Sequence, residues 1–72
     1  MKKSIHTKER AGFVKKLKQA RIYAGFTQLE VSEKLGSSQS WVSKIELGEL
    51  RVEATLLNRL AKLYGKSVSY FL

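Results

Sequence analysis

The sequence predicts an all-α fold, a compact arrangement of five helices, and three observations support this prediction. Apolar residues recur at intervals of three and four through most of the 72 residues, the spacing that places them on one face of a helix. Gly25, Gly36, Gly48 and Gly65 each follow such a stretch, where a left-handed glycine ends a helix at little cost. No proline interrupts the pattern. We therefore expect one helical domain over residues 8–72.

The first helix is expected from about Lys8 to Ala24, with Thr7 as its cap. Its inward face carries Phe13, Leu17, Ala20 and Ala24. Residues 1–7 are short, polar and basic, so we expect a flexible basic N-terminal arm there. The lysines of the helix fall mostly away from its inward face. They form either a solvated surface or a source of long-range attraction to phosphates.

Two short helices separated by one glycine are predicted between Thr27 and Gly48. Thr27 and Glu30 have the spacing of a capping box, in which each residue satisfies a backbone N–H of the other. Ser32 supplies a small side chain where the two helices would touch, and Gly36 ends the first of them. This layout is that of a helix-turn-helix, formed by the second and third helices of the domain.

The second helix of this pair follows Ser37 or Ser38 as its cap and turns Val42 and Ile45 inward. Its outward residues can all form hydrogen bonds and none is acidic. They are Ser38, Gln39, Ser40, Ser43 and Lys44. A helix that is merely solvated usually carries glutamate at several such positions, so this face suits base edges and phosphates better. In a helix-turn-helix the second helix is the one that enters the major groove.

A loop over residues 49–52 leads to a fourth helix, predicted from Ala54 to Tyr64 with Glu53 as its start. Its leucines are dense enough to predict burial on most sides. Ser67 then caps a fifth helix from Val68 to Leu72.

Four of the last five residues are apolar or aromatic, and so short a helix cannot turn all of them inward. Because exposed aromatic clusters usually mark interfaces, we predict a symmetric homodimer formed through this end. The predicted interface consists of Val68, Tyr70, Phe71 and Leu72. The alternative is that Val68 and Phe71 fill the core while Tyr70 and Leu72 fray.

The charge of the chain favours a polyanionic partner. Lysine and arginine total 14 against 6 acidic residues, which gives a net charge of +8 and a pI near 10.1. Residues 1–21 hold eight of the basic residues and one acidic residue. This asymmetry fits either nucleic acid or an anionic membrane surface.

The sequence lacks the residues that catalysis and metal binding need. It has a single histidine, His6, and no cysteine or aspartate, so we predict no catalytic triad and no metal centre. We therefore expect no enzymatic activity and no cofactor, and no small-molecule effector is evident. The absence of cysteine, of a membrane span and of a signal peptide favours a cytoplasmic protein.

The helix-turn-helix residues resemble the phage-repressor family of Cro-type, or XRE, DNA-binding domains. The matching residues are Gln28, Ser32, Gly36, Val42, Ile45, Glu46 and Gly48. The resemblance extends from about Phe13 to Leu72, although Ser32 stands where alanine is commoner and Val52 where many members have proline. It implies a sequence-specific regulator of transcription that binds double-stranded DNA. Residues 39–47 would be the recognition helix, acting on a palindromic operator.

The resemblance also implies an ion pair between Arg21 and Glu46. The residues themselves are consistent with it, because Glu46 follows Ile45 on the inner side of its helix and a buried carboxylate needs a partner. The alternative is two independent surface charges. In the family, a glutamine at the position of Gln28 braces the first glutamine of the recognition helix, which is Gln39 here.

The predicted DNA contacts divide by chemistry. Gln39 can pair bidentately with adenine, and Ser40 and Lys44 are placed to reach the next base edges, with Lys44 preferring guanine or a phosphate. The phosphate candidates are Gln28, Ser38, Ser43 and Arg51. Trp41 either lies against the sugar–phosphate backbone or packs between helices.

Three functions are compatible with these features. The first is a sequence-specific DNA-binding regulator, which motif and charge favour together. The second is a protein-interaction module, such as an antitoxin-like partner binder, that keeps the fold without binding DNA. An acidic recognition face would favour it, and this face is neutral to basic. The third is a membrane-surface protein, which conflicts with the need for the first helix to contribute its apolar face to the core.

Overall fold

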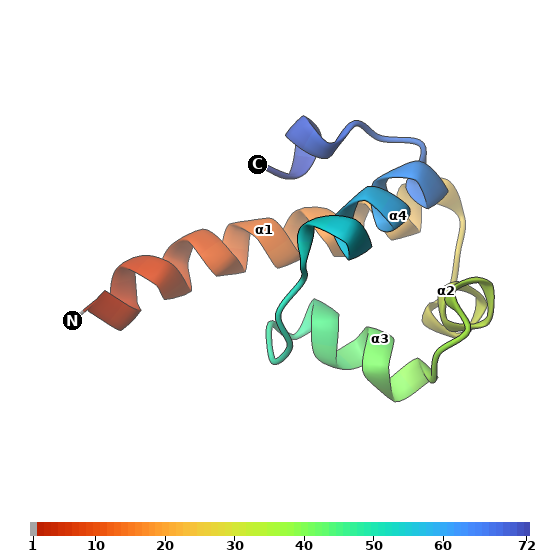
Figure 1. Cartoon of the computed structure of the whole chain (residues 1–72), viewed down its shortest axis with the longest axis horizontal. Coiled ribbons are helices and arrows are strands. Elements are labelled where there is room, and N and C mark those ends of the chain that lie inside the picture. The colour runs from red at the N-terminus through yellow and green to blue at the C-terminus, as the bar shows by residue number, and fades with distance from the viewer. Residues whose placement is uncertain (1) are drawn as a thin grey trace.

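Four α-helices and a terminal 3-10 helix form the described part of the chain (Figure 1). This computed structural model describes the backbone from Lys2 to Leu72 and the side chains from Ala11 onward. The elements are α1 (Lys2–Ala24), α2 (Gln28–Leu35), α3 (Gln39–Glu46), α4 (Ala54–Tyr64) and η1 (Val68–Phe71). The all-α prediction is confirmed, and the count of five α-helices is wrong.

The fifth element is a 3-10 helix of four residues rather than an α-helix. Its hydrogen bonds span three residues, from the N–H of Tyr70 to the carbonyl of Ser67 at 3.1 Å and from Leu72 to Ser69 at 3.2 Å. Short terminal pieces commonly adopt this tighter form.

Helix α1 begins at Lys2, earlier than the start predicted at Lys8. The stretch from Lys2 to Ala11 contains no glycine or proline, so nothing local stops the helix from extending toward the N-terminus. The backbone of residues 2–7, predicted to be a flexible arm, is therefore helical, and Met1 lies outside the described residues. At this end α1 projects beyond the rest of the fold (Figure 1).

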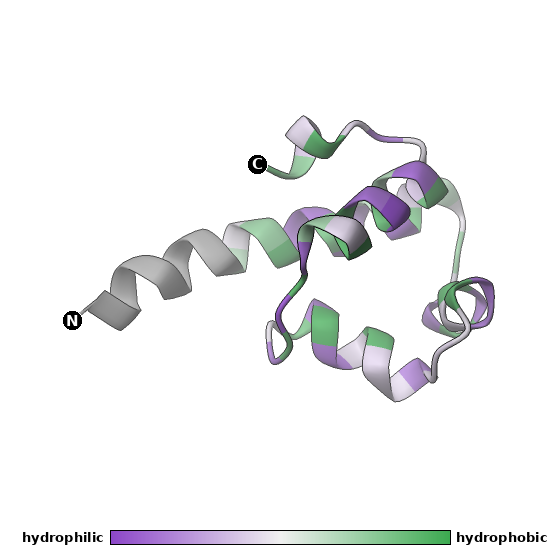
Figure 2. Ribbon diagram, in the orientation of Figure 1, coloured by the Kyte–Doolittle hydropathy of each residue, from purple (hydrophilic) through white to green (hydrophobic). Residues whose placement is uncertain are grey.

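A single apolar core joins α1, α3, α4 and η1, with α2 closing one end. The buried members are Leu17, Ala20, Val31, Val42, Ile45, Leu57, Leu60, Ala61, Tyr64 and Phe71. Figure 2 shows apolar and hydrophilic residues interspersed along α3 and α4, as expected for helices that bury one face and expose the other.

The connection between α2 and α3 follows the predicted turn chemistry. Gly36 has φ +71°, a left-handed conformation that glycine adopts without the steric penalty of a Cβ, and it ends α2. The N–H of Ser37 then donates to the carbonyl of Ser32 at 2.8 Å. Ser38 caps α3 by accepting the N–H of Trp41 at 3.2 Å. The turn therefore holds α3 at a defined angle to α2.

The start of α2 and its contact with α3 also agree with the sequence prediction. The capping box is present, with the Glu30 N–H donating to Thr27 Oγ1 at 3.1 Å and the Thr27 N–H donating to Glu30 Oε1 at 2.8 Å. Ser32 is buried, and its hydroxyl donates to the Leu29 carbonyl at 2.6 Å. A small residue whose polar atom is satisfied within its own helix leaves room for α3 to approach.

The predicted dimer interface is corrected at Phe71, which is only 2% exposed and belongs to the core. Val68 and Tyr70 are half-buried against that core, and Leu72 is 82% exposed. The rings of Tyr70 and Phe71 meet edge to face, with 5.0 Å between their centroids. Lys66 Nζ lies 4.8 Å from the centroid of the Tyr70 ring. The C-terminal segment folds back onto α1 and α4, so its apolar residues largely complete the core of one chain.

No helix in the part of the chain that the structure describes combines the length and the apolar character needed to cross a membrane.

Candidate nucleic-acid interface

The outward face of α3 is polar and basic. Gln39, Ser40 and Lys44 are exposed, whereas Val42 and Ile45 on the opposite side are buried. The side chains of Gln39 and Lys44 form no hydrogen bond or ion pair with another described residue. Their donors and acceptors are therefore free to bind a ligand.

The charge of this face comes from Lys44 alone. The other charged residue of α3, Glu46, points inward, with 5% of its side chain exposed. A helix that presents amides, hydroxyls and one ammonium group to solvent complements the acceptors of guanine, the donor and acceptor of adenine, and phosphate oxygens.

Two serines at the ends of this face have different environments. The Ser38 hydroxyl is already used as the cap of α3 and lies 3.4 Å from the hydroxyl of Ser40. Ser43 is half-buried. A contact from Ser38 to a phosphate would use its hydroxyl hydrogen while its oxygen continues to cap the helix.

Trp41 is half-buried and packs against the apolar core. This packing is one of the two roles that the sequence left open, and the contact with the sugar–phosphate backbone stays a prediction. Arg51, another predicted phosphate contact, is exposed in the loop between α3 and α4.

Arg21 and Glu46 form the expected ion pair, and it links α1 to the end of α3. Arg21 Nε donates to Glu46 Oε2 at 2.7 Å and Arg21 Nη2 donates to Glu46 Oε1 at 3.1 Å, which makes the pair bidentate. Arg21 Nη1 donates to the carbonyl of Phe26 at 2.9 Å, beyond the end of α1. The side chains are 10% and 5% exposed, so the pair is largely shielded from solvent.

Gln28 has a different partner from the one implied by the family resemblance. Its Nε2 donates to Glu46 Oε1 at 3.0 Å, so the predicted brace to Gln39 is corrected to a bond with the ion pair. Each carboxylate oxygen can accept two hydrogen bonds, and Oε1 has room for Gln28 beside Arg21. The start of α2 is thereby tied to the end of α3, and the predicted phosphate contact must come from the remaining polar atoms of Gln28.

Tyr64 is a part of this network that sequence reasoning missed. Burial, and to a smaller extent the nearby Glu46 carboxylate, raise the pKa of its phenol to about 12, while Arg21 acts in the opposite direction. The sequence places Tyr64 at the last position of α4, before Gly65. Only the fold shows that this end of α4 lies close to the ion pair.

Comparison with known proteins gives one result. A family model described as a helix-turn-helix domain matches residues 13–68, which is most of the chain. Neither the comparison with curated proteins nor that with solved structures gives a match.

Proposed function

Because the chain belongs to the helix-turn-helix domain family, we propose that it is a sequence-specific regulator of transcription that places α3 in the major groove of DNA. The observation that carries this proposal is the free polar face of α3, where the side chains of Gln39 and Lys44 have no partner among the described residues. The net charge of +8 adds a general attraction to phosphates.

Within that proposal each exposed group has a role. Gln39 reads adenine through its amide, Lys44 reads guanine acceptors or binds a phosphate, and Ser40 contacts the edge of a neighbouring base. Ser43 and Arg51 contribute phosphate contacts that set the register of the domain on the duplex.

We also propose membership of the Cro-type, or XRE, group within the wider family. Support comes from the bidentate pair between Arg21 and Glu46 and from the buried small residue Ser32 at the contact between α2 and α3. These are positions at which the sequence resembles that group.

A homodimer on a palindromic operator is the assembly that this function favours. One recognition helix reads only a few base pairs, which gives poor selection among the many sites of a genome. With Phe71 buried, the surface left for a symmetric contact is Leu72, adjoining the half-buried Tyr70. Sedimentation of the parent and of Leu72→Ser at high concentration tests this, because a parent that stays monomeric on and off palindromic DNA contradicts it.

Selection from a library of random duplexes tests the central function. We expect successive rounds of gel shift to enrich a short motif, and we expect Gln39→Ala to lose the preference at one base pair of that motif. Val42 and Ile45 are kept, so the variant retains its fold. A library that binds without enrichment would leave only nonspecific electrostatic binding, and a library that does not bind would favour a protein-interaction module.

A further inference from the structure

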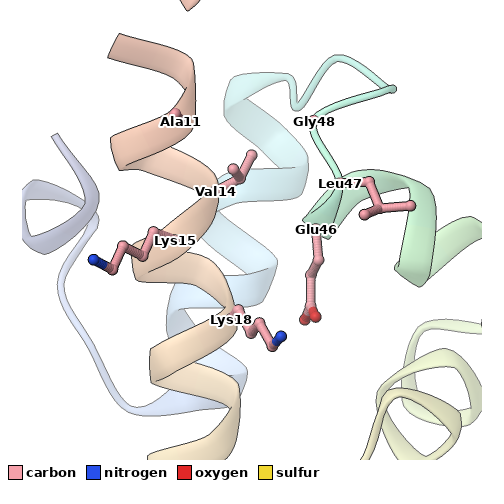
Figure 3. Close-up of a pocket in the computed structure, with 7 residues that line it drawn as sticks. All are labelled: Ala11, Val14, Lys15, Lys18, Glu46, Leu47 and Gly48. Carbon is pink, nitrogen blue, oxygen red and sulfur yellow. The ribbon is translucent and has the colours of Figure 1, made fainter. Parts of the chain in front are cut away.

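A groove lies between α1 and the end of α3, and none of the residues proposed to contact DNA lines it (Figure 3). Its volume is about 440 Å³. The α1 wall consists of Ala11, Val14, Lys15 and Lys18, which follow the three- and four-residue spacing of one helical stripe. Glu46, Leu47 and Gly48 form the opposite wall.

The walls of this groove combine apolar side chains with the two lysines of α1. Leu47 follows α3 with 66% of its surface exposed, an unusual exposure for a large aliphatic side chain placed beside a groove. Val14 lines the α1 wall, with Ala11 one turn earlier, and Leu47 belongs to the opposite wall. Small-molecule sites typically measure a few hundred Å³ and combine apolar walls with few polar groups, which agrees with this arrangement.

The groove also carries an excess of positive charge. In Figure 3 the ammonium group of Lys18 is directed across the groove toward the Glu46 carboxylate, whereas that of Lys15 is directed away. The charge of Glu46 is already balanced, because its oxygens accept hydrogen bonds from Arg21 and Gln28. Lys18 forms no ion pair with any described residue. An anion in the groove would therefore meet an uncompensated ammonium group.

We propose that this groove binds a small monocarboxylate with an apolar body, such as a medium-chain or aromatic acid. The carboxylate pairs with Lys18, and the apolar body covers Val14 and Leu47. Phosphate alone would leave the apolar walls exposed, and a neutral apolar molecule would leave Lys18 without a partner. Since Glu46 and Leu47 mark the end of the recognition helix, such a ligand would contact α1 and α3 together.

Titration of the free protein with octanoate, followed by methyl and amide chemical shifts, tests this binding without reference to DNA. We expect saturable shifts centred on Val14, Leu47 and Gly48. Two probes separate the components: 1-octanol has the same chain without the charge, and inorganic phosphate has charge without the chain. Both should bind more weakly than octanoate at this groove.

Two substitutions make the test decisive. Lys18→Gln should weaken octanoate binding by roughly fivefold, the loss expected for an exposed ion pair. Lys62→Gln, which removes an exposed lysine on α4 away from the groove, should leave it unchanged. Leu47→Ser should also weaken binding, and its exposed position leaves the core intact. Shifts spread over the surface, equal binding of octanol or phosphate, or equal effects of the two lysine variants would overturn the proposal.

Discussion

Removing Arg21 should destabilise the domain far more than removing an exposed arginine. In Arg21→Met the Glu46 carboxylate loses both guanidinium hydrogen bonds, at 2.7 and 3.1 Å, and keeps only the amide of Gln28. With 5% of that side chain exposed, water cannot replace the lost partner in full. Breaking one side of a buried pair typically costs ~3–5 kcal/mol because the remaining charge stays buried.

Replacing both partners should cost less than replacing Arg21 alone. The double variant Arg21→Met/Glu46→Leu removes both charges, and apolar replacement of a buried pair is often close to neutral. The double variant still loses two hydrogen bonds, the one to the carbonyl of Phe26 and the one from the amide of Gln28. Each loss should lower the free energy of unfolding by about 1 kcal/mol. We therefore expect the double variant to be about 2 kcal/mol less stable than the parent and more stable than Arg21→Met.

Thermal and urea unfolding of the parent and of the single and double variants measure these differences. For a domain of this size, 3 kcal/mol corresponds to a fall in Tm of at least ~12 °C. Arg59→Met, at an exposed position on α4, is the matched control and should change stability by less than ~0.5 kcal/mol. If Arg21→Met melts with Arg59→Met, or if the double variant is less stable than Arg21→Met, the pair does not act as a buried unit.

Three further predictions concern the interface and the core. Gln39→Ala and Lys44→Ala should each lose ~1–3 kcal/mol of discrimination between bases at the base pair that the side chain contacts. Gel shift on single-base variants of the selected site measures this loss. Equal losses of affinity on scrambled DNA would show that the side chains contact only the DNA backbone. Binding should weaken steeply between ~50 and ~200 mM salt as counterion release becomes less favourable, and a constant affinity would contradict the electrostatic contribution. The raised pKa of Tyr64, about 12, should stabilise the fold fully below pH 10 and lose this contribution between pH 10 and 12, because the phenol ionises first in the unfolded chain. The free energy of unfolding of the parent should therefore fall by roughly 2–3 kcal/mol relative to that of Tyr64→Phe over that range, with Tyr23→Phe, at an exposed phenol, as control.

The features that the sequence predicted well are local ones. The capping box of Thr27 and Glu30 and the glycine that ends α2 depend on residues within a few positions of each other, so their chemistry can be read from spacing. The outward and inward faces of α3 follow from the same helical period. These are the features that define the candidate interface.

The features that were predicted wrongly depend on tertiary contacts or on the absence of a signal. Phe71 belongs to the core, as in the alternative that the sequence left open, because α1 and α4 leave a space that its ring fills. Gln28 binds Glu46 from a position remote in sequence, although the family resemblance suggested Gln39. The start of α1 at Lys2 was not predicted, because no capping residue or helix breaker in the sequence marks it.

Amide chemical shifts of the full chain, recorded as a selected duplex is added, test most directly that α3 reads DNA through its outward face. We expect the largest changes at residues 38–44, with smaller ones at Gln28 and Arg51, and little change on the outward side of α4. Saturation at a stoichiometry of one chain per half-site would agree with the proposed symmetric complex. Changes centred on α4 or on α1, with residues 38–44 unaffected, would contradict this account of the interface.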